Sequence, residues 1–290
     1  MKAIKNLIIT LVLVVAILGV VIIGGYIYVR TTYGIDLFRT AGQLKTLTQA
    51  VDETELCPDA FGEEDFAAMK TELNKKFDGF VSHEEGKGFN GYSVNFDALN
   101  GKVMTDMISL TEKQVGTVAQ TVFFVQTGGK IKIGEKEVSV TVVQIDFSEI
   151  AANGSADFNV VAKIDLTPFK ADMGDFPYKY FKKYIPDNFY VSSTVRVDKT
   201  EEDGFSYTVT HKALMLNKLS ADDTADLFNT LNAVLKIGTA ENLNMQVGET
   251  VVNALIGTKE NPGFAYSMRA IGAQYFRFET AADADRFIVN

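Results

Sequence analysis

The chain has 290 residues, of which 47% are hydrophobic and 22% are charged. This composition excludes a disordered chain, and the lack of a second long uncharged run excludes a protein that crosses a membrane several times. The net charge is −9, and removing Lys2, Lys5 and Arg30 leaves 25 basic against 37 acidic residues, a balance of −12 that argues against a nucleic-acid partner. Cys57 is the only cysteine, so no internal disulfide or four-cysteine zinc site can form.

The first predicted element is a membrane-spanning helix. The run of residues 7–29, from Leu7 to Val29, has no charged side chain and is rich in Leu, Ile and Val. As a helix it would be about 34 Å long, enough to cross the roughly 30 Å hydrocarbon core of a bilayer. The run is too long for the apolar part of a signal peptide, and no small residues mark a cleavage site at its end. We therefore expect residues 1–30 to be an uncleaved tail and anchor, with the lipid bilayer as a partner.

Tyrosines and basic residues flank the anchor. Tyr26, Tyr28 and Tyr33 suit the aromatic belt at a membrane interface. The basic residues on the two sides nearly balance, so they do not orient the chain. A short tail before a long domain is typical of a bacterial signal-anchor. We expect a single-pass protein of the cell membrane whose domain lies outside the cytoplasm.

Two helical segments precede the first strands. Residues 31–57 predict a juxtamembrane connector that rests on the domain, residues 58–290. Its apolar residues at helical spacing are Leu37, Leu44, Leu47 and Val51. Residues 59–77 predict an amphipathic helix with acidic residues at its start and lysines at its end, an order that suits the helix dipole.

The middle of the chain predicts antiparallel strands. Shorter strands are expected near residues 92–96 and 103–110, and Thr111 with Gln114 forms a capping box for a helix that ends near Phe124. Four long strands are predicted at residues 137–147, 156–166, 188–198 and 204–216. In the second of these, apolar residues occupy one face, and the other face carries Asp157, Asn159, Lys163 and Asp165. The four strands should form a meander with one buried and one wet face.

An aromatic, basic helix is predicted at residues 175–185. Its candidate membrane contacts are Tyr178, Lys179, Lys182 and Lys183. The alternative is that its aromatic residues cover the sheet while the lysines face water.

The C-terminal third predicts further helices and strands. Ser220 caps a predicted helix at residues 221–235, and a second, short helix is expected at 249–256. Strands are predicted at residues 264–271 and 274–279.

Several polar motifs are better explained without a bound cofactor or metal. Residues 86–91 match GxGxxG, but a strand pattern follows them where a dinucleotide site needs a helix. His83 and its acidic neighbours lack metal-site spacing, and Asp283 with Asp285 suits a solvated turn. His211 lies in line with apolar strand residues and should be a packed core or cavity histidine. With only two histidines in the chain, the sequence does not indicate a Ser-His-Asp arrangement.

Long antiparallel strands with a few amphipathic helices predict an α+β domain. The order of elements resembles that of membrane-anchored bacterial envelope proteins of the tubular lipid-binding kind. The resemblance rests on Leu110-Thr111-Glu112, residues 137–166 and residues 176–186, covers about half the chain and contains no specific motif. It implies a non-enzymatic protein that shields a lipid or other apolar ligand in a curved sheet.

The apolar strand face must be sealed by helices or curl around a ligand. The candidate ligand-lining residues are Val138, Val140, Val142, Phe158, Val160, Ile164, Phe189, Val191, Val195, Tyr207 and Val209. One alternative function is a scaffold or accessory subunit of an envelope complex, with a solid core and a groove or edge strand that binds another protein. A second alternative is an envelope enzyme that acts on lipid or glycan.

Overall fold

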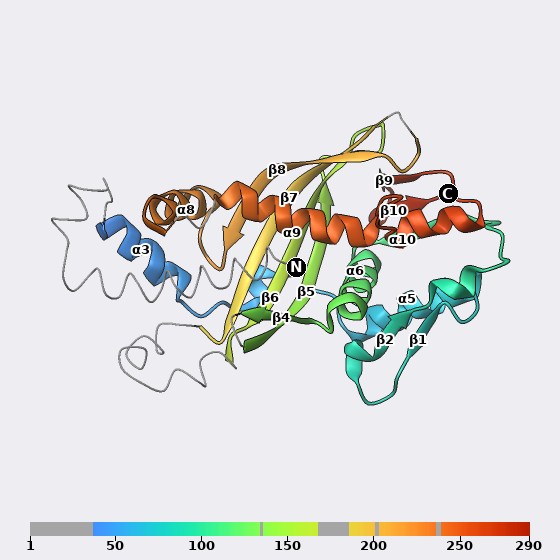
Figure 1. Cartoon of the computed structure of the whole chain (residues 1–290), viewed down its shortest axis with the longest axis horizontal. Helices are drawn as coiled ribbons and strands as arrows, with labels where there is room; N and C mark the ends of the chain where they lie inside the picture. The colour runs from blue at the N-terminus through green and yellow to red at the C-terminus, as the bar shows by residue number, and fades with distance from the viewer. Residues whose placement is uncertain (1–36, 134–135, 168–185, 201–202, 236–238) are drawn as a thin grey trace.

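The structure is a computed structural model that describes residues 37–133, 136–167, 186–200, 203–235 and 239–290 (Figure 1). Within these ranges the fold is α+β, with three antiparallel sheets and several helices, as the sequence predicts. The predicted anchor and the predicted aromatic helix at 175–185 lie outside the described residues. No helix in the described part of the chain is both long enough and apolar enough to cross a membrane.

The main sheet has five strands in the order β4-β5-β6-β7-β8, and each neighbouring pair is antiparallel. Its strands are β4 (Lys130–Ile133), β5 (Lys136–Ser148), β6 (Ala156–Asp165), β7 (Asn188–Lys199) and β8 (Tyr207–Leu216). The four long predicted strands are therefore confirmed, and they follow one another across the sheet as a meander. Bulges interrupt the register at Val142/Gln144 and at Thr194/Val195.

Two smaller sheets complete the strands. One pairs β1 (Val81–His83) with β2 (Tyr92–Val94), and the other has the order β3 (Ile108–Thr111), β10 (Asp285–Val289), β9 (Phe276–Thr280). The C-terminal hairpin thus pairs with a strand from the first half of the chain.

The helices follow the capping signals of the sequence. The longer ones are α3 (Leu37–Leu47), α5 (Glu63–Lys76), α6 (Glu112–Thr127), α8 (Ala221–Leu235) and α9 (Ala240–Leu255). The capping box of α6 is confirmed, because Gln114 N–H donates to Thr111 Oγ1 at 3.3 Å and Thr111 N–H donates to Gln114 Oε1 at 3.0 Å. Ser220 Oγ accepts from Asp223 N–H at 3.1 Å, as expected for the cap of α8.

Two C-terminal predictions need correction. The helix expected at 249–256 is the end of α9, which begins nine residues earlier after the cap residue Thr239. The strand expected at 264–271 is wrong, because this segment forms α10 (Phe264–Ser267) followed by a 3₁₀ turn, Met268–Ile271. Its buried residues, Phe264, Ala265, Met268 and Ile271, have helical spacing.

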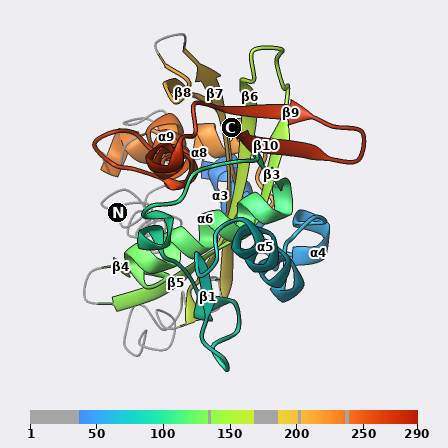
Figure 2. The same cartoon turned by 90° about the vertical axis from the view of Figure 1, so that its right-hand side faces the viewer.

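The core lies between the main sheet and the helices. Figure 1 shows α9 in front of the strands and α6 beside β5, and Figure 2 shows the same sheet nearly edge-on. Helices α6, α8 and α9 contact one side, here called the inner face. The opposite, outer face is contacted near one end by the segment that contains the short helix α4 (Glu53–Leu56).

Candidate functional site

The predicted ligand-lining residues whose side chains the structure describes lie on the inner face, on the side of the sheet that the helices cover. Val140, Ile164, Phe189 and Val191 belong to a buried cluster that includes Leu227 of α8 and Leu243 of α9. Four further residues belong to a second cluster with side chains of α6 and α9: Val142, Phe158, Val160 and Val195. Tyr207 and Val209 are half-buried against this second cluster. The side chain of Val138 lies outside the described residues.

The predicted membrane contacts remain predictions. Tyr26, Tyr28, Tyr33, Tyr178, Lys179, Lys182 and Lys183 all lie outside the described residues.

The polar motifs of the sequence occupy turns and packed positions. Residues 86–91 connect β1 to β2 and include a 3₁₀ turn, Gly88–Gly91. His83 stacks on Tyr92, with ring centroids 4.1 Å apart. Asp283 pairs with Arg286 beside the β9–β10 turn, and His211 contacts Asn244 of α9 through Nδ1 at 2.8 Å. Within the described ranges, no group of three His, Cys, Asp or Glu residues could hold a metal ion.

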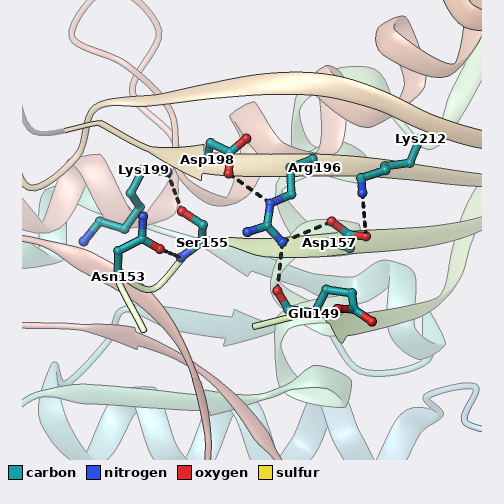
Figure 3. A network of polar contacts seen from close by, with 8 residues as sticks. All are labelled: Glu149, Asn153, Ser155, Asp157, Arg196, Asp198, Lys199 and Lys212. Atoms are coloured by element: carbon teal, nitrogen blue, oxygen red, sulfur yellow. Dashed lines mark hydrogen bonds and ion pairs between the residues drawn. The ribbon is translucent and has the colours of Figure 1, made fainter. Parts of the chain in front are cut away.

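A charged network crosses the outer face at one end of the sheet (Figure 3). Arg196 of β7 bonds to Asp157 of β6 at 3.2 Å and to Asp198 at 2.9 Å, and its Nη1 also donates to the carbonyl of Glu149 at 2.8 Å. Lys212 of β8 lies 3.5 Å from Asp157. The Arg196 and Asp157 side chains are only 18% and 11% exposed. The network thus joins three strands, and each carboxylate has a basic partner.

An uncharged network continues along the same face. Asn159 Oδ1 accepts hydrogen bonds from Ser192 at 3.0 Å and from Thr194 at 3.1 Å. Asn159 Nδ2 donates to Asp146 at 3.2 Å, and Gln144 Nε2 donates to the same carboxylate oxygen at 2.7 Å. These side chains satisfy one another, so this part of the outer face is polar and its side chains are held in fixed positions.

The connector is fastened to the domain at several points. Gln43 of α3 donates to Asp226 of α8 at 3.0 Å, and Asn217 donates to the carbonyl of Leu47 at 2.6 Å. On the outer face, Glu53 Oε2 accepts from Lys163 Nζ at 2.5 Å and from Tyr190 OH at 2.6 Å. The described part of the connector therefore runs from the α8 side of the sheet to its outer face.

Glu53 gives a pH-dependent test of this attachment. Burial raises the pKa of Glu53, but the bonds from Lys163 and Tyr190 outweigh it, so the pKa lies below its ordinary value. A carboxyl group with a lowered pKa stabilises the fold above its unfolded pKa, about 4.3, and this stabilisation is lost as the pH falls through the folded pKa. We expect Glu53→Gln to lower the free energy of unfolding by about 1 kcal/mol at neutral pH, after allowing for solvent screening, and by much less below about pH 4.

Denaturant titrations at several pH values, followed by circular dichroism, measure this difference. Glu55→Gln is the matched control, because Glu55 lies on the same short helix and is exposed. Equal losses for the two variants at neutral pH would contradict the role of Glu53.

The two edges of the main sheet differ. On the β5 side, β4 has only four residues and pairs with only the first part of β5. Backbone groups further along β5 bond to α6 instead: Val142 N–H donates to Gln120 at 2.8 Å, and Phe147 N–H donates to Glu112 at 2.5 Å. Phe61 N–H also donates to the carbonyl of Val143 at 3.2 Å. At the other edge, β8 is the last strand, and no described strand pairs with its far side. Among the described residues, the β5 edge is therefore covered and the β8 edge is open.

The backbone geometry of β8 shows which groups its open edge presents. The bond from Thr200 N–H to the carbonyl of Ser206, 3.0 Å, marks a hydrogen-bonded pair, and such pairs alternate along an antiparallel ladder. By this alternation the N–H and C=O groups of Tyr207, Val209 and His211 point away from β7. The bulge opposite Thr194/Val195 interrupts the strand beyond His211. The regular part of the open edge is therefore 207–211.

Comparison of the chain with protein-family models, with curated proteins and with solved structures found no match. Sequence patterns did not identify β8 as the open edge of the main sheet, nor the residues that bond to Glu53 and Arg196. Alternating polar residues in the strands were the signal for a wet outer face, but they did not identify the partners.

Proposed function

We propose that this protein is a membrane-anchored, non-enzymatic scaffold or accessory subunit of an envelope protein complex, and that it binds an extended segment of its partner along β8. The open edge of β8 is the observation that carries this proposal. Addition of a strand to an exposed sheet edge is a common mode of peptide recognition, in which main-chain hydrogen bonds supply affinity.

The contrast between the edges supports the choice of β8. Natural sheets protect their edges with short strands, lysines, bulges or covering elements. Strand β4 is short and carries Lys130 and Lys132, and the edge beyond it is covered by α6. Strand β8 has ten residues, of which Lys212 is the only charged one, and its bulge leaves 207–211 regular. A partner segment of about five residues fits this stretch.

Packing of the inner face favours this function over the shielding of a lipid. A lipid carrier with a curved sheet needs space between the sheet and its helices. Here Phe158 and Val160 are fully buried in one cluster with Val115 and Val118 of α6. The lipid-binding function implied by the resemblance therefore has less support than the interaction function.

The connector supports a role in which the position of the domain matters. If residues 7–29 span the membrane, seven residues separate Val29 from Leu37, and the eight Cα-to-Cα steps between them reach at most about 28 Å. From Leu37 onwards the connector is helical and then fastened to α8 and the outer face. The proposed anchor thus holds the domain, and its open edge, near the bilayer surface.

Site-specific photo-crosslinking in cells tests the proposal. A photoreactive residue at Thr210, which is exposed on β8, should give one discrete protein adduct, and the same residue at exposed Lys75 of α5 should not. Val209→Pro should abolish the adduct, because proline lacks the N–H that points to the open edge.

Val209→Ala is the matched control, since it shortens the same side chain but keeps the N–H, and its adduct should persist. Thermal unfolding of both variants verifies that each is folded. Adducts of equal yield from the proline variant and the alanine variant would contradict strand addition at β8.

A further inference from the structure

Helix α9 lies over β8 along the regular part of its open edge. At one end of this stretch, Asn244 Nδ2 is 2.8 Å from His211 Nδ1. At the other end, Tyr207 OH donates to Asn253 Oδ1 at 2.6 Å. The helix between these contacts spans about 13 Å, the same length as the four strand steps from Tyr207 to His211. The middle of this part of α9 is therefore level with Val209.

One stripe of α9 lies above the open edge. Met245, Glu249 and Asn253 are four residues apart and share one face of the helix. The bond made by Asn253 places this face on the β8 side. The neighbouring face packs on β7, where a Cβ on Gly248 would collide with Val195 Cγ1. Glu249 is exposed and is the charged member of the stripe.

The carboxylate of Glu249 has no basic partner among the residues that the structure describes. It lies close enough to β8 to affect a hydroxyl there, because burial and, to a lesser degree, the charge of Glu249 raise the pKa of Tyr207 to about 12. An unpaired carboxylate beside an open strand edge favours a partner that brings a positive charge to it.

The helices that cover β8 carry charge of the same sign. Together α8 and α9 contain no basic residue and five acidic ones: Asp222, Asp223, Asp226, Glu241 and Glu249. Lys236, in the link between the helices, lies outside the described residues, and Arg39 of α3 pairs with Asp223 and Asp226. Even if Lys236 and Arg39 are counted, acidic side chains outnumber basic ones by five to two. This balance attracts a cationic segment to the edge.

An added strand presents one side chain to Glu249. Such a strand lies about 4.8 Å beyond β8, and the residue that pairs with Val209 places its side chain on the same face. There it meets Val209 and Tyr207, which are half-buried, and the α9 stripe above them. A lysine or arginine suits both features, because its methylene stem covers apolar surface while its charged head extends to the carboxylate. A carboxylate at this position would be repelled.

The outer side of the same stretch offers hydroxyl groups. Thr208 and Thr210 are exposed on β8. Threonine pairs across neighbouring strands hydrogen-bond, so serine or threonine suits the positions on either side of the basic residue. Lys212 lies beyond the regular stretch and is 3.5 Å from Asp157, so its charge has a partner on the outer face.

We propose that the partner of β8 is a protein with an extended segment in which a lysine or arginine pairs with Val209, and that Glu249 selects this residue. The inference rests on the proposed function and adds the chemistry of the partner. A second copy of this chain does not fit, because residues 207–211 contain no lysine or arginine. Pairing of two copies would also bring both Glu249 carboxylates to the same face of the joint sheet.

Fluorescence anisotropy on the full chain in phosphatidylcholine nanodiscs tests the proposal. The probes are three labelled peptides, Thr-Val-Thr-X-Thr-Val-Thr, with lysine, methionine or glutamate at X. The lysine peptide should bind about fivefold more tightly than the methionine peptide, the upper end for an exposed ion pair, and the glutamate peptide should bind most weakly. The lipid carries no net charge and does not attract the cationic peptide, and empty nanodiscs give the blank.

Glu249→Gln should remove the preference for lysine over methionine. Glu64→Gln is the matched control, because it removes the same charge from an exposed position on α5, and it should keep the preference. Equal binding of the lysine and methionine peptides to the native chain would overturn the proposal. A preference that survives in Glu249→Gln, or absence of binding by the lysine peptide, would also overturn it.

Two further outcomes separate this inference from the proposed function. If the three peptides bind equally, and if Val209→Pro abolishes this binding while Val209→Ala keeps it, strand addition at β8 stands and the selection by charge fails. An adduct from Thr210 with twice the mass of the chain would identify a second copy as the partner and would overturn the basic segment in the same way.

Discussion

Phe158→Ala is expected to lower the free energy of unfolding by about 3–5 kcal/mol. Phe158 lies in β6, near the middle of the main sheet, and is fully buried. Its ring contacts those of Phe147 and Phe278, with centroids 5.6 Å and 6.3 Å away. Truncation removes the transfer free energy of the ring and leaves a cavity that neighbours on three elements cannot fill without moving. The chain has no tryptophan, so denaturant unfolding is best followed by circular dichroism.

The size of this loss separates a solid core from a ligand cavity. A residue that lined a lipid-filled space would lose less, because a mobile ligand could occupy the vacated volume. Val125→Ala on α6 is the control, since Val125 is 54% exposed and its truncation should change stability by less than about 0.5 kcal/mol. A loss below about 1 kcal/mol for Phe158→Ala would contradict the packed inner face.

Arg196→Met is expected to cost about 3 kcal/mol of stability, the lower end of the range for breaking a buried ion pair. The substitution keeps much of the side-chain volume but leaves the poorly exposed carboxylate of Asp157 with Lys212, 3.5 Å away, as its remaining basic contact. Asp198 also loses its partner. Denaturant unfolding of the single variants and of the Asp157→Asn/Arg196→Met double variant gives the coupling between the two side chains.

An exposed ion pair supplies the comparison. Lys87 and Glu84 lie 2.8 Å apart, but both side chains are more than half exposed. Lys87→Met should therefore change stability by less than about 0.5 kcal/mol. If the Lys87 and Arg196 variants lost the same free energy of unfolding, burial would not strengthen the ion pairs of the Figure 3 network.

Local patterns in the sequence predicted the four long strands of the main sheet because alternation and turn residues act over a few positions. The Thr111 capping box and the Ser220 cap were predictable for the same reason. The segment at 264–271 was assigned the wrong period, since a short apolar run fits either a strand or a helix. Pairing of β3 with β10 joins residues far apart in the chain, and no local signal specifies it.

The candidate sites were less predictable than the fold. Periodicity identified the inner-face residues from Val140 to Val209 but cannot say whether helices or a ligand lie opposite them. Glu53 and Lys163 are 110 positions apart, so their bond follows from the tertiary path of the connector and not from any motif. The open edge of β8 depends on strand order, which is known only once the sheet is assembled.

The path of the connector has a mechanical consequence. Its contacts lie on both sides of the main sheet, at Asp226 on α8 and at Lys163 and Tyr190 on the outer face. In a chain anchored as we propose, a sideways force on the anchor would act on these contacts together. The main sheet would then rotate as a rigid body with the connector. The orientation of β8 would then depend on the tilt of the anchor. A change in that tilt would change the direction in which the open edge of β8 faces a partner.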